Sequence, residues 1–122
     1  MDIEPVGAVI RATGGGEGGQ GMESTIPAIS PMGTLRDVLE ALSDPVRLEM
    51  VRRLDHEGTP VACADLYDSV SKSTASHHFK VLREAGVTER LTVAGNTHQR
   101  LRLEDLEAAY PGVVSSILAA AV

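Results

Sequence analysis

The sequence predicts a mainly helical fold with a small β-hairpin (α+β), arranged as a winged helix-turn-helix. Three observations predict it. Apolar residues recur at helical spacing through most of the chain after residue 33, polar and apolar residues alternate over 87–103, and basic residues gather over 72–102. Several helices, then a turn, a helix and a β-ribbon, follow one another in the order of a winged helix-turn-helix. With 122 residues, the chain can form one domain with one core.

Two amphipathic helices are expected first. The stripe of the first helix follows i, i+3, i+4, i+7 spacing, at Leu35, Val38, Leu39 and Leu42. Asp44-Pro45 is typical of a capped helix start with proline in the first turn. The second helix then runs to the breaker at 56–60, and a short third helix is expected over 62–70.

The next helix, expected over 74–85, has two contrasting faces. Its inward stripe is Ala75, His78, Phe79, Leu82 and Ala85. Its outward face carries short polar and cationic groups: Ser73, Thr74, Ser76, His77, Lys80 and Arg83. A helix that enters the DNA major groove needs both faces, one to hold it on the core and one to reach bases and phosphates. Ser73 is a candidate N-cap, and Gly86 suits a left-handed terminator.

A hairpin and two short helices complete the expected domain. Residues 87–93 and 97–103 alternate in polarity around a turn at Ala94-Gly95-Asn96. Helices follow over 104–110 and 113–121, separated by Pro111-Gly112. The domain is therefore expected over 33–122.

Residues 1–32 are expected to form a flexible, glycine-rich tail. The run GGGEGGQG (14–21) has few side chains to bury and much backbone entropy to lose. A phosphate-binding loop is the alternative, but no strand and helix surround these glycines. No apolar run reaches the roughly 20 residues of a membrane helix, and the start lacks the basic region of a secretory signal.

The charge is uneven, and its distribution matters more than the net value of −6. Residues 72–102 hold six Lys or Arg and two acidic residues, whereas the segments on both sides are net acidic. This pattern predicts a local DNA-binding surface. The residues expected to contact DNA are Lys72, Ser73, Thr74, Ser76, His77, Lys80, Arg83, Arg90, Asn96, Arg100 and Arg102.

These motifs together resemble the arsenic-repressor (ArsR/SmtB) family of bacterial regulators. The resemblance rests on ALSDPVRLEMVRRL (41–54), STASHHFKVLREAGV (73–87) and the hairpin, and covers about residues 35–118. It implies a homodimer whose first and last helices form the interface, a helix that reads the major groove, and a wing that grips the flank. Most members are repressors released by a metal or another signal. The expected interface residues are Leu35, Leu39, Val113, Val114, Ile117 and Leu118.

The chain departs from the family at its metal-sensing motifs. Relatives place two cysteines around one residue before the reading helix, but here Ala62 and Ala64 flank a lone Cys63. The zinc ligands of the last helix are also missing from residues 113–121. No metal or other cofactor is therefore expected. A non-standard site remains an alternative, drawn from His56, Cys63, His77, His78 and His98.

Single residues can be interpreted in two ways. Cys63 suits a small, partly buried position, with a redox or soft-metal role as the alternative. As the single cysteine of the sequence, Cys63 cannot form an internal disulfide, which fits a reducing cytoplasm. His78 is expected to be structural, His77 to contact DNA, and His56 to cap a helix or face solvent.

The leading hypothesis is a cytoplasmic, sequence-specific DNA-binding regulator. It is expected to act as a repressor and to bind an inverted repeat in double-stranded DNA as a homodimer. One alternative is a metal-responsive (nickel or zinc) regulator, and an unidentified small effector is also open. Another is a winged-helix protein-interaction module, which the basic charge of 72–102 disfavours. No arrangement of residues indicates an enzyme, and no membrane partner is expected.

Overall fold

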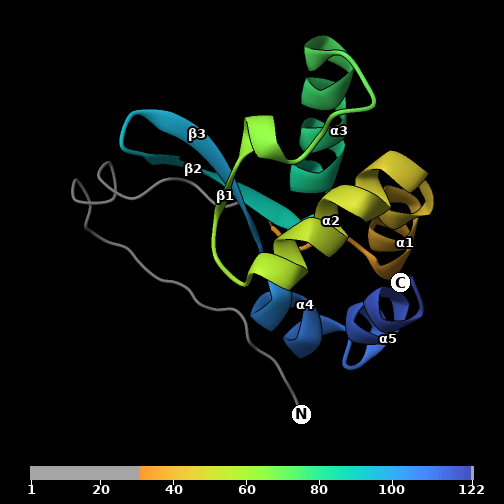
Figure 1. The fold of residues 1–122 in the computed structure, drawn as a ribbon. Helices are drawn as coiled ribbons and strands as arrows, with labels where there is room; N and C mark the ends of the chain where they lie inside the picture. Colours follow the sequence, from red (N-terminus) through yellow and green to blue (C-terminus); the bar gives the residue numbers. More distant parts are fainter. Residues whose placement is uncertain (1–30, 122) are drawn as a thin grey trace.

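In the computed structural model, which describes residues 31–121, helices pack around a small antiparallel sheet (Figure 1). The expected tail thus lies outside the described residues, except for its last two. The elements in order are α1 (Leu35–Ser43), α2 (Pro45–Glu57), β1 (Val61–Ala62), the 3-10 turn η3 (Cys63–Asp65), α3 (Lys72–Glu84), β2 (Thr88–Val93), β3 (Asn96–Leu101), α4 (Leu103–Ala109) and α5 (Val113–Ala120). The mainly helical winged helix-turn-helix fold is confirmed.

The first two helices begin where local capping predicts. Thr34 forms a capping box with Asp37, each side chain accepting a hydrogen bond from the other's backbone N–H. Asp44 caps α2 through Val46 N (2.9 Å) and Arg47 N (3.0 Å), with Pro45 in the first turn. The two helices therefore meet at one sharp corner at Asp44.

The expected helix over 62–70 is wrong. The chain instead forms β1, the single turn η3, and bends up to Ser71. Val61 and Ala62 pair with Gln99 and His98 of β3. Pairing with a distant strand overrides the local helical preference of this segment. Leu66 is nevertheless buried, as the apolar pattern requires.

Helix α3 starts two residues earlier than expected. Its N-cap is Ser71, whose hydroxyl accepts from Thr74 N at 3.2 Å, so Ser73 lies inside the helix. The inward stripe of α3 is buried as expected. Gly86 follows with φ 86°, and a side chain there would meet the backbone of Met32 and Gly33. Gly33 N in turn donates to Ala85 O at 3.0 Å, so the chain before α1 lies against the end of α3.

The sheet has the order β1-β3-β2, and the β2–β3 hairpin projects from the helices as a wing (Figure 1). Its turn is Ala94-Gly95, with φ of 51° and 84°. Positive φ at both central residues matches the twist of a two-residue hairpin. At the base of the wing, the hydroxyl of Thr88 donates to Oε1 of Gln99 (3.0 Å), a buried polar pair.

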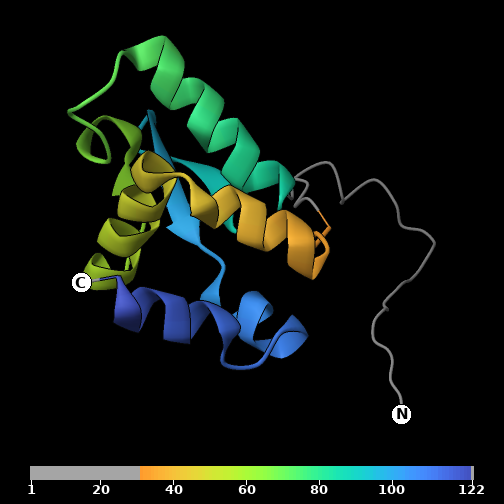
Figure 2. The same ribbon diagram turned by 90° about the vertical axis from the view of Figure 1, so that its right-hand side faces the viewer.

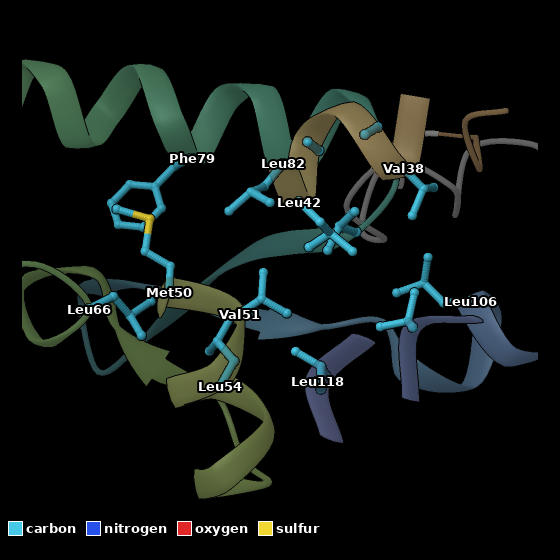
Figure 3. Packing of buried hydrophobic residues seen from close by; sticks show 14 of the residues in the cluster. Val38, Leu42, Met50, Val51, Leu54, Leu66, Phe79, Leu82, Leu106 and Leu118 are labelled. Carbon is cyan, nitrogen blue, oxygen red and sulfur yellow. The ribbon is translucent and has the colours of Figure 1, made fainter. Parts of the chain in front are cut away.

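The helical body has three levels in both views: α3 at one side, α1 and α2 in the middle, α4 and α5 at the other (Figures 1 and 2). The core joins them and includes Val38, Met50, Val51, Phe79, Leu82, Leu106 and Leu118 (Figure 3). Helix α5 begins after Gly112, and Glu107 of α4 caps it by accepting from Gly112 N at 2.9 Å. That hydrogen bond lowers the pKa of Glu107.

Candidate nucleic-acid interface

The outward face of α3 is open to solvent along its first three turns. Ser73, Thr74, Ser76, His77 and Lys80 are all exposed. At the helix start, the Ser71 hydroxyl donates to Oγ1 of Thr74 (3.1 Å). This face offers short hydrogen-bonding side chains near the N-terminus and a cation one turn further, an order suited to bases and then phosphates.

A groove of about 320 Å³ lies between α3 and one face of the wing. Its lining is Cys63, Tyr67, Lys72, Ser76, Phe79, Lys80, Arg83, Arg90, Thr97 and Gln99. Four of these residues are cationic and none is acidic. Lys80 also lies 4.0 Å from Glu84, but both side chains are largely exposed, so this ion pair is weak. The groove therefore concentrates positive charge in a protein of net negative charge.

Arg83 and Arg90 both line this groove and act on each other electrostatically. Burial lowers the pKa of Arg83, and the nearby charge of Arg90 lowers it further. Two like charges held close together are unfavourable on their own. An anion placed between them, such as a DNA phosphate, would relieve that repulsion and accept hydrogen bonds from both guanidinium groups.

Arg90 and Arg100 of the wing, and Arg102 just after it, lie in three different environments. Register pairs Arg90 with Gln99 on the face towards α3, and Glu89 with Arg100 on the opposite face. Arg100 forms an ion pair with Glu89. Arg102 is only 7% exposed and donates to Asp105 at 3.1 Å. This burial argues against the phosphate contact expected for Arg102, whereas Asn96 is exposed beside the hairpin turn.

Sequence reasoning missed several groove residues. Gln99 is buried and donates to Sγ of Cys63 at 3.7 Å, and the Tyr67 ring contacts Phe79 edge-on at 6.2 Å. Strand alternation carries part of the signal, because it places Thr97 and Gln99 on the same face as Arg90. Cys63 itself is half-buried, in agreement with its expected structural position.

The histidines lie in separate environments. His78 is buried in the inward stripe, and Arg47 donates to its Nδ1 at 3.0 Å, which confirms the structural role expected for it. His77 faces solvent on the same helix, and His56 is exposed at the end of α2. Within residues 31–121, no three His, Cys, Asp or Glu side chains gather in a way that could hold a metal ion.

The six residues expected at a dimer interface divide into two groups. Leu35 and Leu39 are 41% and 44% exposed on α1, although both are large and apolar. Val113 and Ile117 are half-buried on α5. Val114 and Leu118 are already buried inside the chain, so they need no partner to cover them. The apolar surface left for a partner is therefore centred on α1.

The single turn η3, then α3 with its exposed polar face, then a basic hairpin, follow one another in the order of a winged helix-turn-helix protein. Residues 42–90 match the family model described as a helix-turn-helix domain. The chain is 33% identical over 82 residues to the uncharacterized HTH-type transcriptional regulator YceK of Bacillus subtilis (strain 168), covering 66% of this chain and 82% of that protein. The chain belongs to the HTH-type transcriptional regulators, a family of regulators rather than enzymes.

The fold is also seen in a solved structure. A crystal structure of an ArsR family transcriptional regulator is similar with a TM-score of 0.54 and 20% identity, covering 70% of this chain and 89% of that one. The transcriptional repressor BigR from Xylella fastidiosa is similar with a TM-score of 0.49 and 25% identity, over 62% and 85% of the two chains. The fold that the ArsR/SmtB resemblance implies is therefore shown by the similarity to the ArsR family structure. No helix within the described range has the length and apolar character to cross a membrane.

Proposed function

We propose that the protein is a repressor that binds an inverted repeat in double-stranded DNA as a homodimer. The groove between α3 and the wing carries this proposal, because Arg83 and Arg90 lie together there beside the open face of α3. In this assignment Lys72, Lys80, Arg83 and Arg90 bind phosphates and fix the register. Ser73, Thr74, Ser76 and His77 are nearer the helix start and read base edges.

The exposed leucines of α1 support the dimer. Leu35 and Leu39 lie four residues apart, so they form one apolar strip on the helix surface. A two-fold contact of this strip with a second copy covers it, with Val113 and Ile117 at its border. Such a dimer presents two α3 helices to one side of DNA, which requires half-sites about 10 base pairs apart.

Repression and a cytoplasmic location follow from the family resemblance. A dimer that covers an operator blocks the transcription machinery there, and bacterial chromosomal DNA lies in the cytoplasm. The protein-interaction alternative is less well supported, since a protein-docking wing gains nothing from a pair of adjacent arginines facing the α3 groove.

Selection from random double-stranded DNA tests the function. The full-length protein is expected to enrich inverted repeats, and sedimentation is expected to give a dimer at micromolar concentration. Enrichment of no sequence, with binding no tighter than to random DNA, would overturn the proposal. A monomer that still binds the selected DNA would overturn the dimer alone.

His77→Ala tests the assignment of base reading. The expected cost is on the order of 1–3 kcal/mol per half-site, with relaxed preference at one base position. The free energy of unfolding stays the same, because the side chain is exposed. Titration of the selected DNA and of single-base variants measures both effects. Unchanged affinity for every variant would remove His77 from the reading face.

A further inference from the structure

Arg47 joins three elements at the corner between α1 and α2. Its Nε donates to Ala41 O at 2.7 Å and its Nη2 lies 3.4 Å from Glu40 O, both in the last turn of α1. Carbonyls in the last turn of a helix lack partners within the helix. Its Nη1 contacts Nδ1 of His78, on α3, at 3.0 Å. One side chain of α2 thus holds the end of α1 and the middle of α3 together.

The chemistry of the two groups fixes the direction of the contact with His78. A guanidinium carries five N–H donors and no acceptor, so Nδ1 of His78 must accept. The imidazole is then neutral, with its proton on Nε2. The other charged group near the ring is Asp44, whose Oδ2 lies 3.9 Å from Nδ1 and is already occupied by two backbone N–H groups of α2.

The contact lies directly beneath the outward face of α3. His78 is buried, while its neighbour His77 is exposed about 100° further round the helix, with their ring centroids 5.9 Å apart. Rotation or tilt of α3 at His78 therefore displaces His77 and the adjacent Ser76. A partly buried hydrogen bond to a charged donor resists such movement more strongly than apolar contacts, because its geometry is directional.

We propose that Arg47 is a positioning residue for DNA reading, acting through its hydrogen bond to His78. This role rests on the proposed function of α3 as the reading helix. Arg47 touches no DNA in this proposal. It holds α3 at one orientation relative to α1, the helix that carries the dimer contact, and so sets where the two reading faces of a dimer point.

Paired variants of the full-length protein separate positioning from stability. His78→Leu removes the acceptor, whereas His78→Asn keeps a carbonyl oxygen near the position of Nδ1. Arg47→Lys keeps the charge but loses the fork that reaches α1 and His78 at once. Arg52→Lys is the matched control, because Arg52 is on the same helix and hydrogen-bonds only within it, to Glu49.

The measurement is affinity for the selected operator and for scrambled DNA at one salt concentration, beside thermal unfolding. His78→Leu and Arg47→Lys are expected to lower the operator-to-scrambled affinity ratio on the order of tenfold. His78→Asn and Arg52→Lys are expected to keep the wild-type ratio. Affinity for scrambled DNA stays within about twofold in all four, since the phosphate-binding side chains are unchanged.

An unchanged ratio in folded His78→Leu would overturn the positioning role, even if its stability falls. Equal loss in His78→Asn and His78→Leu would do the same, because the acceptor would then be irrelevant. If Arg47→Lys does not fold, the two His78 variants still decide. A wild-type protein with no preference for any sequence would overturn the DNA-reading function itself, and the positioning role with it.

Discussion

The two faces of the wing differ although their residues alternate along the same strands. On the face towards α3, Arg90 lies beside Arg83 and close to two lysines. On the opposite face, Arg100 is paired with Glu89. The two arginines are both partly exposed and look equivalent in the sequence. The comparison teaches that strand register decides which cations of a basic segment face the groove and which pair with an acidic residue of the neighbouring strand.

The largest expected effect separates these two faces directly. Arg83→Ala with Arg90→Ala removes two phosphate contacts per subunit, so the slope of log affinity against log salt is expected to fall by about 4 for a dimer. Arg100→Ala is expected to change the slope by less than about 1. Titrations at several salt concentrations measure both. Equal salt slopes for the double variant and for Arg100→Ala would contradict the division of the wing into two faces.

Arg102 extends the comparison to a third environment. Arg102→Met is expected to lower the free energy of unfolding by about 1–3 kcal/mol, because a partly buried charge-assisted hydrogen bond to Asp105 is lost. DNA affinity of the folded variant is expected to match wild type. Chemical denaturation and DNA titration test the two statements. If the variant is as stable as wild type but binds DNA weakly, Arg102 contacts DNA after all.

Acid is expected to affect the α1–α2 corner and leave the groove charges in place. Partial burial raises the pKa of Asp44, but the hydrogen bonds from the backbone N–H groups of Arg47 and Val46 and the charge of Arg47 outweigh it, so the net shift is downward. A carboxyl whose pKa is lower in the folded state stabilises the fold above its unfolded pKa, about 3.9, and this stabilisation disappears as pH falls through the folded pKa.

Asp44→Asn isolates the stabilisation that comes from the charge of Asp44, since asparagine also caps helices well. The variant is expected to be less stable than wild type at pH 7, by no more than about 1 kcal/mol at this partly exposed site, and the difference is expected to disappear as pH falls through the lowered pKa of Asp44. Denaturation from pH 2 to 7 measures it. A difference that is constant over this range would mean that the charge of Asp44 contributes nothing.

Cys63→Ser is expected to have the smallest effect. The thiol lines the groove and accepts from Gln99, and a serine hydroxyl can accept there as well. DNA affinity is expected to stay within about twofold, which is under 0.5 kcal/mol. A variant that binds DNA but no longer responds to its signal in cells would instead identify Cys63 as a sensor.

Features of the fold that depend on neighbouring residues in the chain could be predicted from the sequence. Asp44-Pro45 and Gly86 mark helix ends through their own backbone preferences, so α2 and α3 were placed within about two residues. The segment over 62–70 was misassigned because its structure depends on pairing with β3, more than 30 residues away. Long-range pairing leaves no mark in local periodicity.

The candidate site was predicted only in part, because some of its residues depend on long-range contacts. The outward residues of α3 follow from helical spacing and are exposed as expected. Whether Arg100 and Arg102 can contact DNA depends on the acidic side chain that each one pairs with in the folded protein, Glu89 and Asp105. Arg47 was not identified at all, because its importance comes from contacts with α1 and α3, and its position in a helix reads as an ordinary exposed arginine.

Helix α1 is anchored to α3 at both of its ends. Arg47 ties its last turn to His78, and at its start Gly33 donates to Ala85 beside Gly86, where neither glycine has room for a side chain. Contacts with α3 at both ends of α1 restrict rotation of one helix relative to the other. We therefore expect the two helices to move together, so that in the proposed dimer a change in the spacing of the two α3 helices would arise where the protomers meet.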